Sequence, residues 1–103
     1  MNLNYAVDRL YETGWLAEQR TDCERLSDGR RYPTVAAVRA EFGRAGLELS
    51  IKQNLMFKCY QAEWTAAGDA PGGTVVASCE KEAAVYALAQ LRRANAEQLL
   101  TVG

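Results

Sequence analysis

The sequence predicts a single α+β domain, in which an N-terminal helix and a small hairpin-like segment precede an α-β-β-β-α unit with a three-stranded antiparallel sheet. The chain has 103 residues and is 49% apolar and 24% charged, which is typical of one globular domain with one core. Apolar residues recur with helical spacing in three separate segments. Between the second and the third of these segments, apolar residues alternate with polar ones, as in a β-strand. We expect residues 1–103 to form one domain, with 1–32 as a helical extension and 33–99 as the core.

The first helix is predicted near the N-terminus. Leu3, Val7 and Leu10 recur at i, i+4 and i+7, which places them on one face of a helix. Gly14 follows, and glycine tolerates the left-handed conformation that often ends a helix. We therefore expect a short amphipathic helix that ends near this glycine.

A small hairpin is predicted before the core. The dipeptide Asp28-Gly29 tolerates the positive φ angles of a tight turn. Cys23–Leu26 and Arg30–Tyr32 flank this turn and could pair as short strands.

The second helix begins after Thr34, whose hydroxyl group can cap a helix N-terminus. Val35, Val38 and Phe42 mark one helical face. Gly46 is placed to end the helix, so the spacing predicts a helix between Thr34 and Gly46.

Two strands are predicted next. Leu47, Leu49 and Ile51 alternate with polar residues, as in a half-buried strand. Gln53-Asn54 is the expected turn, and the aromatic-rich run Leu55–Trp64 is the expected second strand.

The third strand and the last helix complete the pattern. Residues 65–73 contain glycine and proline and are predicted as a loop, followed by a strand over Thr74–Ser78. A long helix is predicted over Glu80–Leu99, with acidic residues in its first turn, as the helix dipole favours. Its predicted apolar face consists of Ala84, Ala87, Leu88, Leu91 and Ala94.

Composition argues against several classes of function. The net charge is −1, so no overall field attracts the chain to nucleic acid or to an anionic membrane. The sequence contains no histidine, which excludes Ser-His-Asp and Cys-His arrangements. We therefore expect no enzyme, no catalytic residues, no cofactor and no metal site.

Cysteine usage and hydropathy suggest a cytoplasmic location. The three cysteines lack Cys-x-x-Cys spacing, which argues against a zinc site and a disulfide scaffold and predicts thiols in a reducing compartment. The longest apolar run is far shorter than the roughly 20 residues that a membrane span requires. The N-terminus lacks the basic start and apolar core of a signal peptide, so we expect no membrane partner and no secretion.

Residues 33–94 resemble the double-stranded RNA-binding domain family. Pro33-Thr34-Val35 and the following Val38-Arg39-Ala40-Glu41-Phe42-Gly43 are similar to the first helix of that family. The segment Cys79-Glu80-Lys81-Glu82-Ala83-Ala84 aligns with the start of its second helix. This resemblance implies an α-β-β-β-α fold and recognition of RNA duplexes by shape.

The resemblance also identifies candidate RNA contacts and departures from the family pattern. Glu41 would occupy the place of the glutamate that reaches a minor groove, and Lys81 is the one cation kept from a lysine cluster. The Gly-Pro-x-His loop of the family is absent, and residues 33–103 hold seven cations and seven anions. Fewer phosphate contacts should weaken binding strongly. Weak binding of structured or double-stranded RNA is therefore the alternative function, through Glu41, Lys81, Arg30, Arg31, Arg39 and Arg44.

The preferred hypothesis is a non-catalytic interaction module that binds a protein or self-associates. In the predicted second strand, Tyr60 and Trp64 point to one face and, with Met56, would form an apolar patch if the sheet face is open. The structural alternative is that the N-terminal helix folds across this face and completes a second small core.

Overall fold

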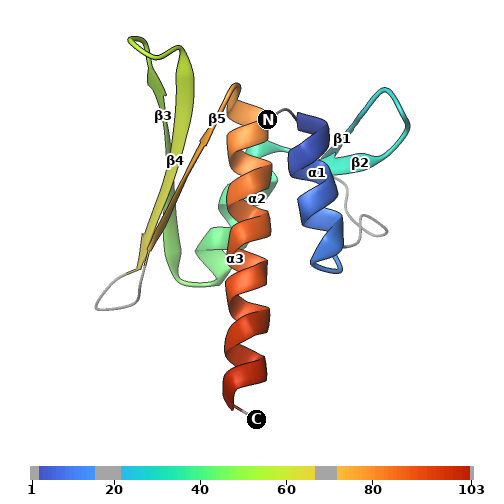
Figure 1. Cartoon of the computed structure of the whole chain (residues 1–103), viewed down its shortest axis with the longest axis vertical. Coiled ribbons are helices and arrows are strands. Elements are labelled where there is room, and N and C mark those ends of the chain that lie inside the picture. The colour runs from blue at the N-terminus through green and yellow to red at the C-terminus, as the bar shows by residue number, and fades with distance from the viewer. Residues whose placement is uncertain (1–2, 16–21, 67–71, 103) are drawn as a thin grey trace.

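Helices and strands alternate along the chain as the sequence predicts (Figure 1). The computed structural model describes residues 3–15, 22–66 and 72–102, with side chains for residues 3–15, 22–65 and 72–94. The elements are α1 (Leu3–Glu12), β1 (Cys23–Arg25), β2 (Arg31–Pro33), α2 (Val35–Arg44), β3 (Leu47–Asn54), β4 (Cys59–Ala66), β5 (Gly73–Ala77) and α3 (Glu80–Val102). The α+β class and the antiparallel three-stranded sheet are confirmed.

The sheet has the order β3-β4-β5, and its two faces differ in polarity. Trp64 lies opposite Leu49 on β3, and Ala62 lies opposite Val75 on β5. These four side chains are buried, so they form the inner face that packs on the helices. The outer face is mostly polar and carries Glu48, Ser50, Lys52, Gln61, Glu63, Thr65 and Thr74.

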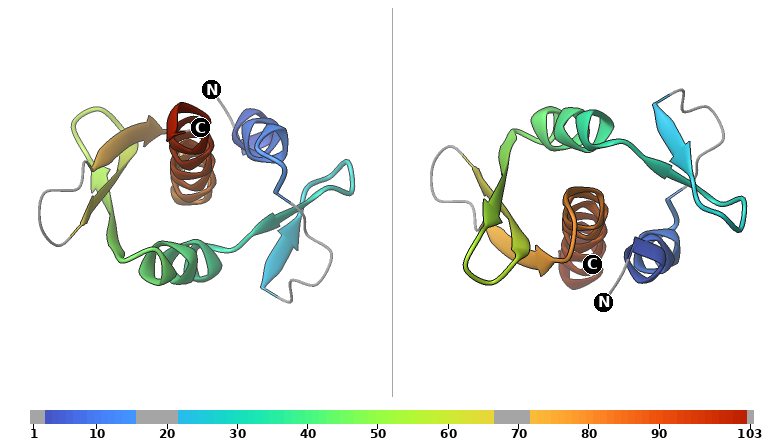
Figure 2. Two further views of the ribbon diagram at one scale, coloured as in Figure 1. Left: turned by 90° about the horizontal axis from the view of Figure 1, so that it is seen from below. Right: turned by 90° about the horizontal axis from the view of Figure 1, so that it is seen from above.

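The long helix α3 lies in the middle of the molecule (Figure 2). The sheet and α2 pack on it, and α1 lies on the side away from the sheet. Much of its first half is buried on all sides, and small side chains there let the neighbouring elements approach closely. The buried residues of α3 are Glu82, Ala83, Ala84, Val85, Ala87, Leu88 and Ala89.

α1 forms a second packing layer against α3. Val7 and Leu10 are fully buried, and the Tyr5 ring meets Tyr86 of α3 edge-on with ring centroids 6.0 Å apart. Arg92 of α3 donates from Nε to the hydroxyl oxygen of Thr13 at 2.9 Å, just beyond the end of α1. These contacts make residues 3–15 part of the packed core.

The cap of α2, the end of α1 and the β1–β2 turn have the residues that the sequence predicts. The hydroxyl oxygen of Thr34 accepts the N–H of Ala37 at 3.2 Å and caps α2. Gly14 has a φ of 86° after α1, and Gly29 has a φ of 93° in the β1–β2 turn. The hairpin around Asp28-Gly29 is confirmed, with strands that pair antiparallel.

Candidate functional site

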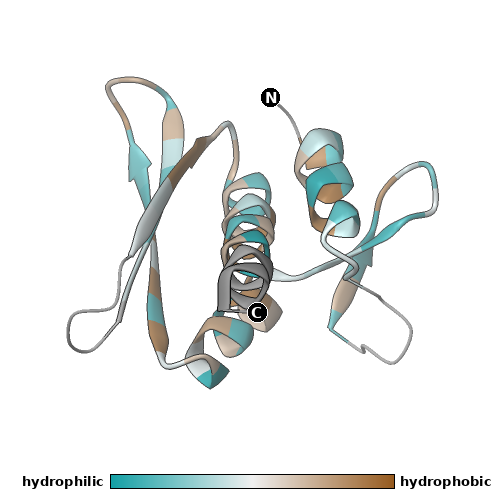
Figure 3. Ribbon diagram, turned by 60° about the horizontal axis from the view of Figure 1, so that its bottom comes forward, coloured by the Kyte–Doolittle hydropathy of each residue, from teal (hydrophilic) through white to brown (hydrophobic). Residues whose placement is uncertain are grey.

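The loop between β3 and β4 carries the most exposed apolar residues of the described chain. Leu55, Met56 and Phe57 are 78%, 83% and 72% exposed, and we call these three residues the β3–β4 tip. The tip lies at the far end of the hairpin, where the hydropathy colouring shows an apolar segment (Figure 3). A contiguous apolar surface at such a place is typical of an interaction site.

The side chain of Asn54 fixes the shape of the tip. Its Oδ1 accepts the N–H groups of Met56 at 3.0 Å and of Phe57 at 3.2 Å. Lys58 closes the turn with a φ of 50°. Because asparagine readily bonds to backbone groups that follow it, this residue specifies a turn that directs the next side chains outward.

The turn between β3 and β4 begins at Leu55, whereas the sequence predicts it at Gln53-Asn54. Gln53 and Asn54 are the expected turn, but both belong to β3, which pairs with β4 as far as Asn54 opposite Cys59. Leu55–Lys58 therefore form the loop, and the expected second strand begins at Cys59. The physical reason is the Asn54 side chain, which satisfies the loop amides that a strand would have paired.

Two lysines flank the tip. Lys52 and Lys58 are both exposed, and the sequence has no acidic residue between Lys52 and Ala62. A shallow hollow beside the tip is lined by Lys52, Gln53, Asn54, Leu55 and Gln61. The apolar tip is therefore surrounded by a locally positive and polar collar, although the whole chain has a net charge of −1.

The expected patch of Met56, Tyr60 and Trp64 does not form. Met56 is exposed, Tyr60 is half-buried, and Trp64 is 8% exposed. The Trp64 ring packs against Phe42 of α2 with ring centroids 5.5 Å apart. The prediction of an exposed Trp64 is wrong because its face of β4 is the inner face of the sheet.

The alternative position of the N-terminal helix is also wrong. α1 does not cover a sheet face, because it packs on the opposite side of α3 (Figure 2). A second packing layer does form, but it lies between α1, the β1–β2 hairpin and α3. Its residues include Leu10, Trp15 and Tyr32.

Arg30 and Arg31, two candidates for RNA contact, take part in contacts within the chain. The Arg30 guanidinium forms ion pairs with Asp8 of α1 and, at 2.9 Å, with Asp28 of its own turn. The Arg31 carbonyl oxygen accepts the hydroxyl group of Tyr11 at 2.7 Å. This segment therefore joins the hairpin to α1.

The candidates on α2 are also engaged. Arg44 Nη2 lies 2.6 Å from Glu41 Oε1 in an ion pair one turn apart. Arg39 Nη1 donates to the carbonyl oxygen of Leu49 on β3 at 3.1 Å. A phosphate ligand would have to compete with these contacts, which would reduce its gain from each arginine.

Lys81 belongs to a polar cluster at the start of α3. Its Nζ lies 2.5 Å from Glu24 Oε2, which also accepts the hydroxyl group of Tyr32 at 2.8 Å. Hydrogen bonds from Lys81 and from Tyr32 hold the pKa of Glu24 below its usual value of 4.5. The cluster joins the β1–β2 hairpin to α3.

Between pH 7 and pH 3, the free energy of unfolding should fall less in the Glu24→Gln variant than in the wild type. Because the pKa of Glu24 is lower in the folded chain, its ionised form contributes stability above about pH 4.5, and this contribution disappears as the pH falls further. The effect should be below about 1 kcal/mol, since the pair is accessible to solvent. Urea unfolding at pH 7 and pH 3 measures it. Glu48→Gln on the outer sheet face is the control, and an equal change in both variants would contradict the role of Glu24.

Potential metal ligands do not cluster in the described residues. No three cysteine, aspartate or glutamate side chains among them lie close enough to hold a metal ion. Glu82 is fully buried, and its Oε1 accepts the hydroxyl group of Ser78 at 2.6 Å. Cys79 Sγ accepts the Glu82 N–H at 3.4 Å, so this thiol caps α3. None of the helices in the described part of the chain is long and apolar enough to cross a bilayer.

Comparison with known proteins leaves the β3–β4 tip as the main guide to function. No protein-family model matches this chain, and no curated protein or solved structure matches it. The resemblance of residues 33–94 to double-stranded RNA-binding domains therefore stays a prediction.

Leu55 and Phe57 are the site residues that sequence reasoning missed. A signal for them exists, because three consecutive apolar residues cannot all point to one face of a strand. The preceding Asn54 is a residue typical of turns. Together these two observations favour an exposed apolar turn at this point.

Proposed function

We propose that this chain is a non-catalytic interaction module that inserts the β3–β4 tip into an apolar pocket of a partner protein. The observation that carries this proposal is the exposure of Leu55, Met56 and Phe57 on a turn fixed by Asn54. Such side chains gain free energy when a partner removes them from water. Aromatic residues and methionine are also enriched in protein interfaces.

The two lysines beside the tip favour a partner that has acidic residues around its pocket. Lys52 and Lys58 would meet such carboxylates at the rim of the contact, where opposite charges speed association and favour the correct orientation. The partner surface that fits this tip is therefore an apolar hollow with a negatively charged rim.

Self-association through the tip is disfavoured by charge and by area. In a symmetric dimer each tip would face its own copy, so the lysines would lie near like charges. Three side chains expose only a few hundred Å², whereas a stable interface of standard size buries about 800 Å² on each partner. Insertion into a pocket of a different protein makes better use of a small convex surface.

The RNA alternative is supported less well than the protein partner. The loop that the family resemblance assigns to RNA contact contains Leu55, Met56 and Phe57 here. Arg30, Arg44 and Lys81 form ion pairs inside the chain. A duplex would therefore meet three apolar side chains in this loop and cations that are already ion-paired at Arg30, Arg44 and Lys81.

The double variant Leu55→Ser with Phe57→Ser should remove partner binding and leave the fold intact. Two anchor residues of a binding pocket contribute at least about 2 kcal/mol, so affinity should fall roughly 30-fold or more. The free energy of unfolding should change by less than about 0.5 kcal/mol, because both side chains are exposed. Val76→Ser is the matched control, since Val76 is exposed on the outer sheet face.

Affinity capture from a cell lysate with wild type, tip variant and control provides the candidates. Each protein that the tip variant loses and the control keeps is then purified, and its dissociation constant is measured by calorimetry with all three chains. A tip-dependent loss of affinity supports the proposal. Equal affinity for wild type and tip variant would contradict it, as would the absence of any tip-dependent protein.

Two direct titrations test the other macromolecules. Binding of a labelled RNA duplex of about 20 base pairs with a steep salt dependence would overturn the proposal in favour of RNA. Tip-dependent binding to phosphatidylcholine and phosphatidylserine vesicles would overturn it in favour of a lipid surface. We expect no binding in either titration.

A further inference from the structure

The two edges of the β3-β4-β5 sheet differ in how their backbone groups are occupied. Arg39 of α2 donates from Nη1 to the carbonyl oxygen of Leu49 on β3 at 3.1 Å, so α2 occupies part of the β3 edge. Figure 2 shows α2 beside β3, whereas β5 forms the opposite margin of the sheet. The β5 edge is therefore the one that a further strand can join.

Strand pairing identifies the backbone groups that point outward from β5. In an antiparallel sheet the N–H and C=O groups of one residue point to the same side, and successive residues alternate. Because the carbonyl group of Leu49 points away from β4, the residue opposite it, Trp64, bonds to β5 instead. The residues of β5 that bond to β4 are thus Gly73, Val75 and Ala77. The N–H and C=O groups of Thr74 and Val76 point outward.

The β5 edge lacks the features that usually prevent edge pairing. No residue in the described part of the chain forms a hydrogen bond with the outward backbone groups of Thr74 and Val76. The strand Gly73–Ala77 contains no charged residue and no proline, which commonly block the edge strands of natural sheets. Val76 is 51% exposed on the outer face beside this edge. The edge is therefore open to an uncharged strand.

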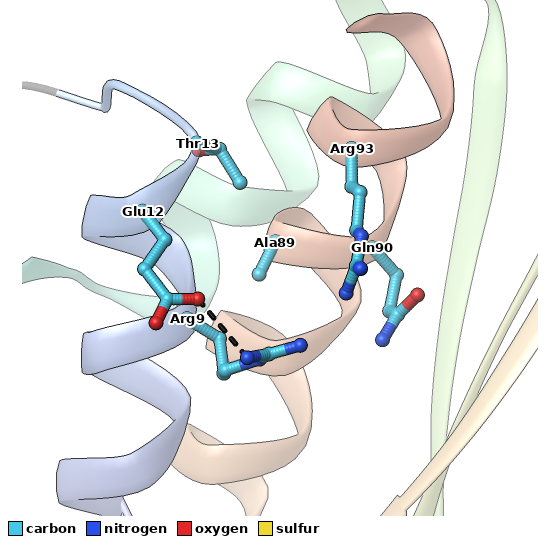
Figure 4. Close-up of a pocket in the computed structure, with 6 residues that line it drawn as sticks. All are labelled: Arg9, Glu12, Thr13, Ala89, Gln90 and Arg93. Atoms are coloured by element: carbon cyan, nitrogen blue, oxygen red, sulfur yellow. Dashed lines mark ion pairs between the residues drawn. The ribbon is translucent and has the colours of Figure 1, made fainter. Parts of the chain in front are cut away.

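α1 does not reach the β5 edge, because it packs on the side of α3 away from the sheet. Figure 4 shows α1 and α3 side by side around a polar cavity. Arg9 Nη1 lies 3.1 Å from Glu12 Oε2 at the α1 wall, and Gln90 and Arg93 of α3 line the other wall. An apolar strand would meet charged side chains on that side, so β5 offers it the better place.

We propose that a second copy of this chain pairs antiparallel with β5, so that two three-stranded sheets form one sheet of six strands. β5 is the one strand without a charged residue in the described part of the chain, so it matches its own edge better than the other strands do. With the two-fold axis at Val75, Thr74 of each copy lies opposite Val76 of the other. Each of these two pairs then exchanges two main-chain hydrogen bonds.

The small size of this junction implies a weak dimer. One edge strand of five residues buries less than the roughly 800 Å² on each partner that a standard interface buries. The dimer should therefore form at high protein concentration and dissociate on dilution. The β3–β4 tip stays accessible, because β5 pairs with β4 only over Tyr60–Trp64. Dimerisation is therefore independent of binding through the tip.

Sedimentation equilibrium of the full chain at concentrations up to about 1 mM tests the proposal. Val76→Lys should weaken the dimer roughly tenfold or more, because it places two like charges beside the two-fold axis. Val76→Pro should do the same, because it removes an outward N–H group without breaking a bond to β4. Thr65→Lys is the matched control, since Thr65 is exposed on the outer face of the central strand. It should dimerise as wild type does.

Hydrogen exchange measured by NMR gives a second readout on the wild-type chain. The amide protons of Thr74 and Val76 should exchange more slowly as the protein concentration rises. Those of Val75 and Ala77 should be protected at every concentration, and that of Ile51 on the β3 edge should not change. Protection of Ile51 in place of Thr74 and Val76 would overturn the proposal.

Three outcomes of sedimentation would also overturn the β5 dimer. The first is a chain that stays monomeric at about 1 mM, which would leave the β5 edge to an extended segment of another protein. The second is equal weakening of the dimer by Thr65→Lys. The third is loss of the dimer in the double variant Leu55→Ser with Phe57→Ser, which would assign self-association to the β3–β4 tip.

Discussion

Alanine in place of Trp64 is expected to lower the free energy of unfolding by about 3–5 kcal/mol. The indole is 8% exposed and packs against Phe42 of α2, which is fully buried. Removing it would leave a cavity between the sheet and α2. Urea unfolding followed by circular dichroism measures the change, because this signal does not depend on the tryptophan itself.

A second variant tests the packing of Trp64 by adding a methyl group beside the indole. A Cβ atom on Gly73 would lie 2.6 Å from the Trp64 Cε2 atom, so Gly73→Ala forces the indole to move. Overpacking of this kind costs about 1–3 kcal/mol. Val76→Ala on the outer face is the control and should change stability little. A loss below about 1 kcal/mol for Trp64→Ala would contradict the buried position of the indole.

Leu10→Ala should have the second large effect, about 2–5 kcal/mol. Leu10 is fully buried in the layer between α1 and α3. Since α3 is shared by this layer and by the sheet side, loss of packing at Leu10 should destabilise both. We therefore expect the whole domain to unfold in a single transition at a lower urea concentration.

The two tryptophans report on the two sides of α3 separately. Trp15 belongs to the α1 side, and Trp64 belongs to the sheet side. Trp64→Phe leaves Trp15 as the fluorescent reporter, and Trp15→Phe leaves Trp64. Leu10→Ala is introduced into each background. Coincident fluorescence transitions support one cooperative core. A Trp15 transition that precedes the Trp64 transition would show that α1 detaches first.

Local patterns predict most of the secondary structure. The helical spacing of Leu3, Val7 and Leu10 and the cap at Thr34 depend on nearest neighbours along the chain, and both predictions are confirmed. The exposure of Trp64 could not be predicted in this way, because both faces of its strand carry apolar residues. Its inner position depends on strand pairing with Leu49 on β3 and Gly73 on β5 and on packing against Phe42 of α2, which the local pattern does not show.

The place of α1 depends on tertiary packing that its own sequence does not specify. An amphipathic helix needs an apolar surface, and α3 offers one, whereas the outer face of the sheet is mostly polar. Small residues such as Ala87 and Ala89 give α3 an apolar surface on several sides, so α1 can pack there. The candidate site was predicted in part: Met56 is exposed as expected, whereas Leu55 and Phe57 were assigned to a strand.

The central position of α3 also affects how the chain folds during synthesis. Residues 80–102 leave the ribosome after every other described element. Until then, Leu10, Trp64 and Phe42 lack the helix that completes their surroundings. Until α3 emerges, the nascent chain therefore exposes the apolar surfaces of both layers, and such surfaces are prone to aggregation or to capture by chaperones.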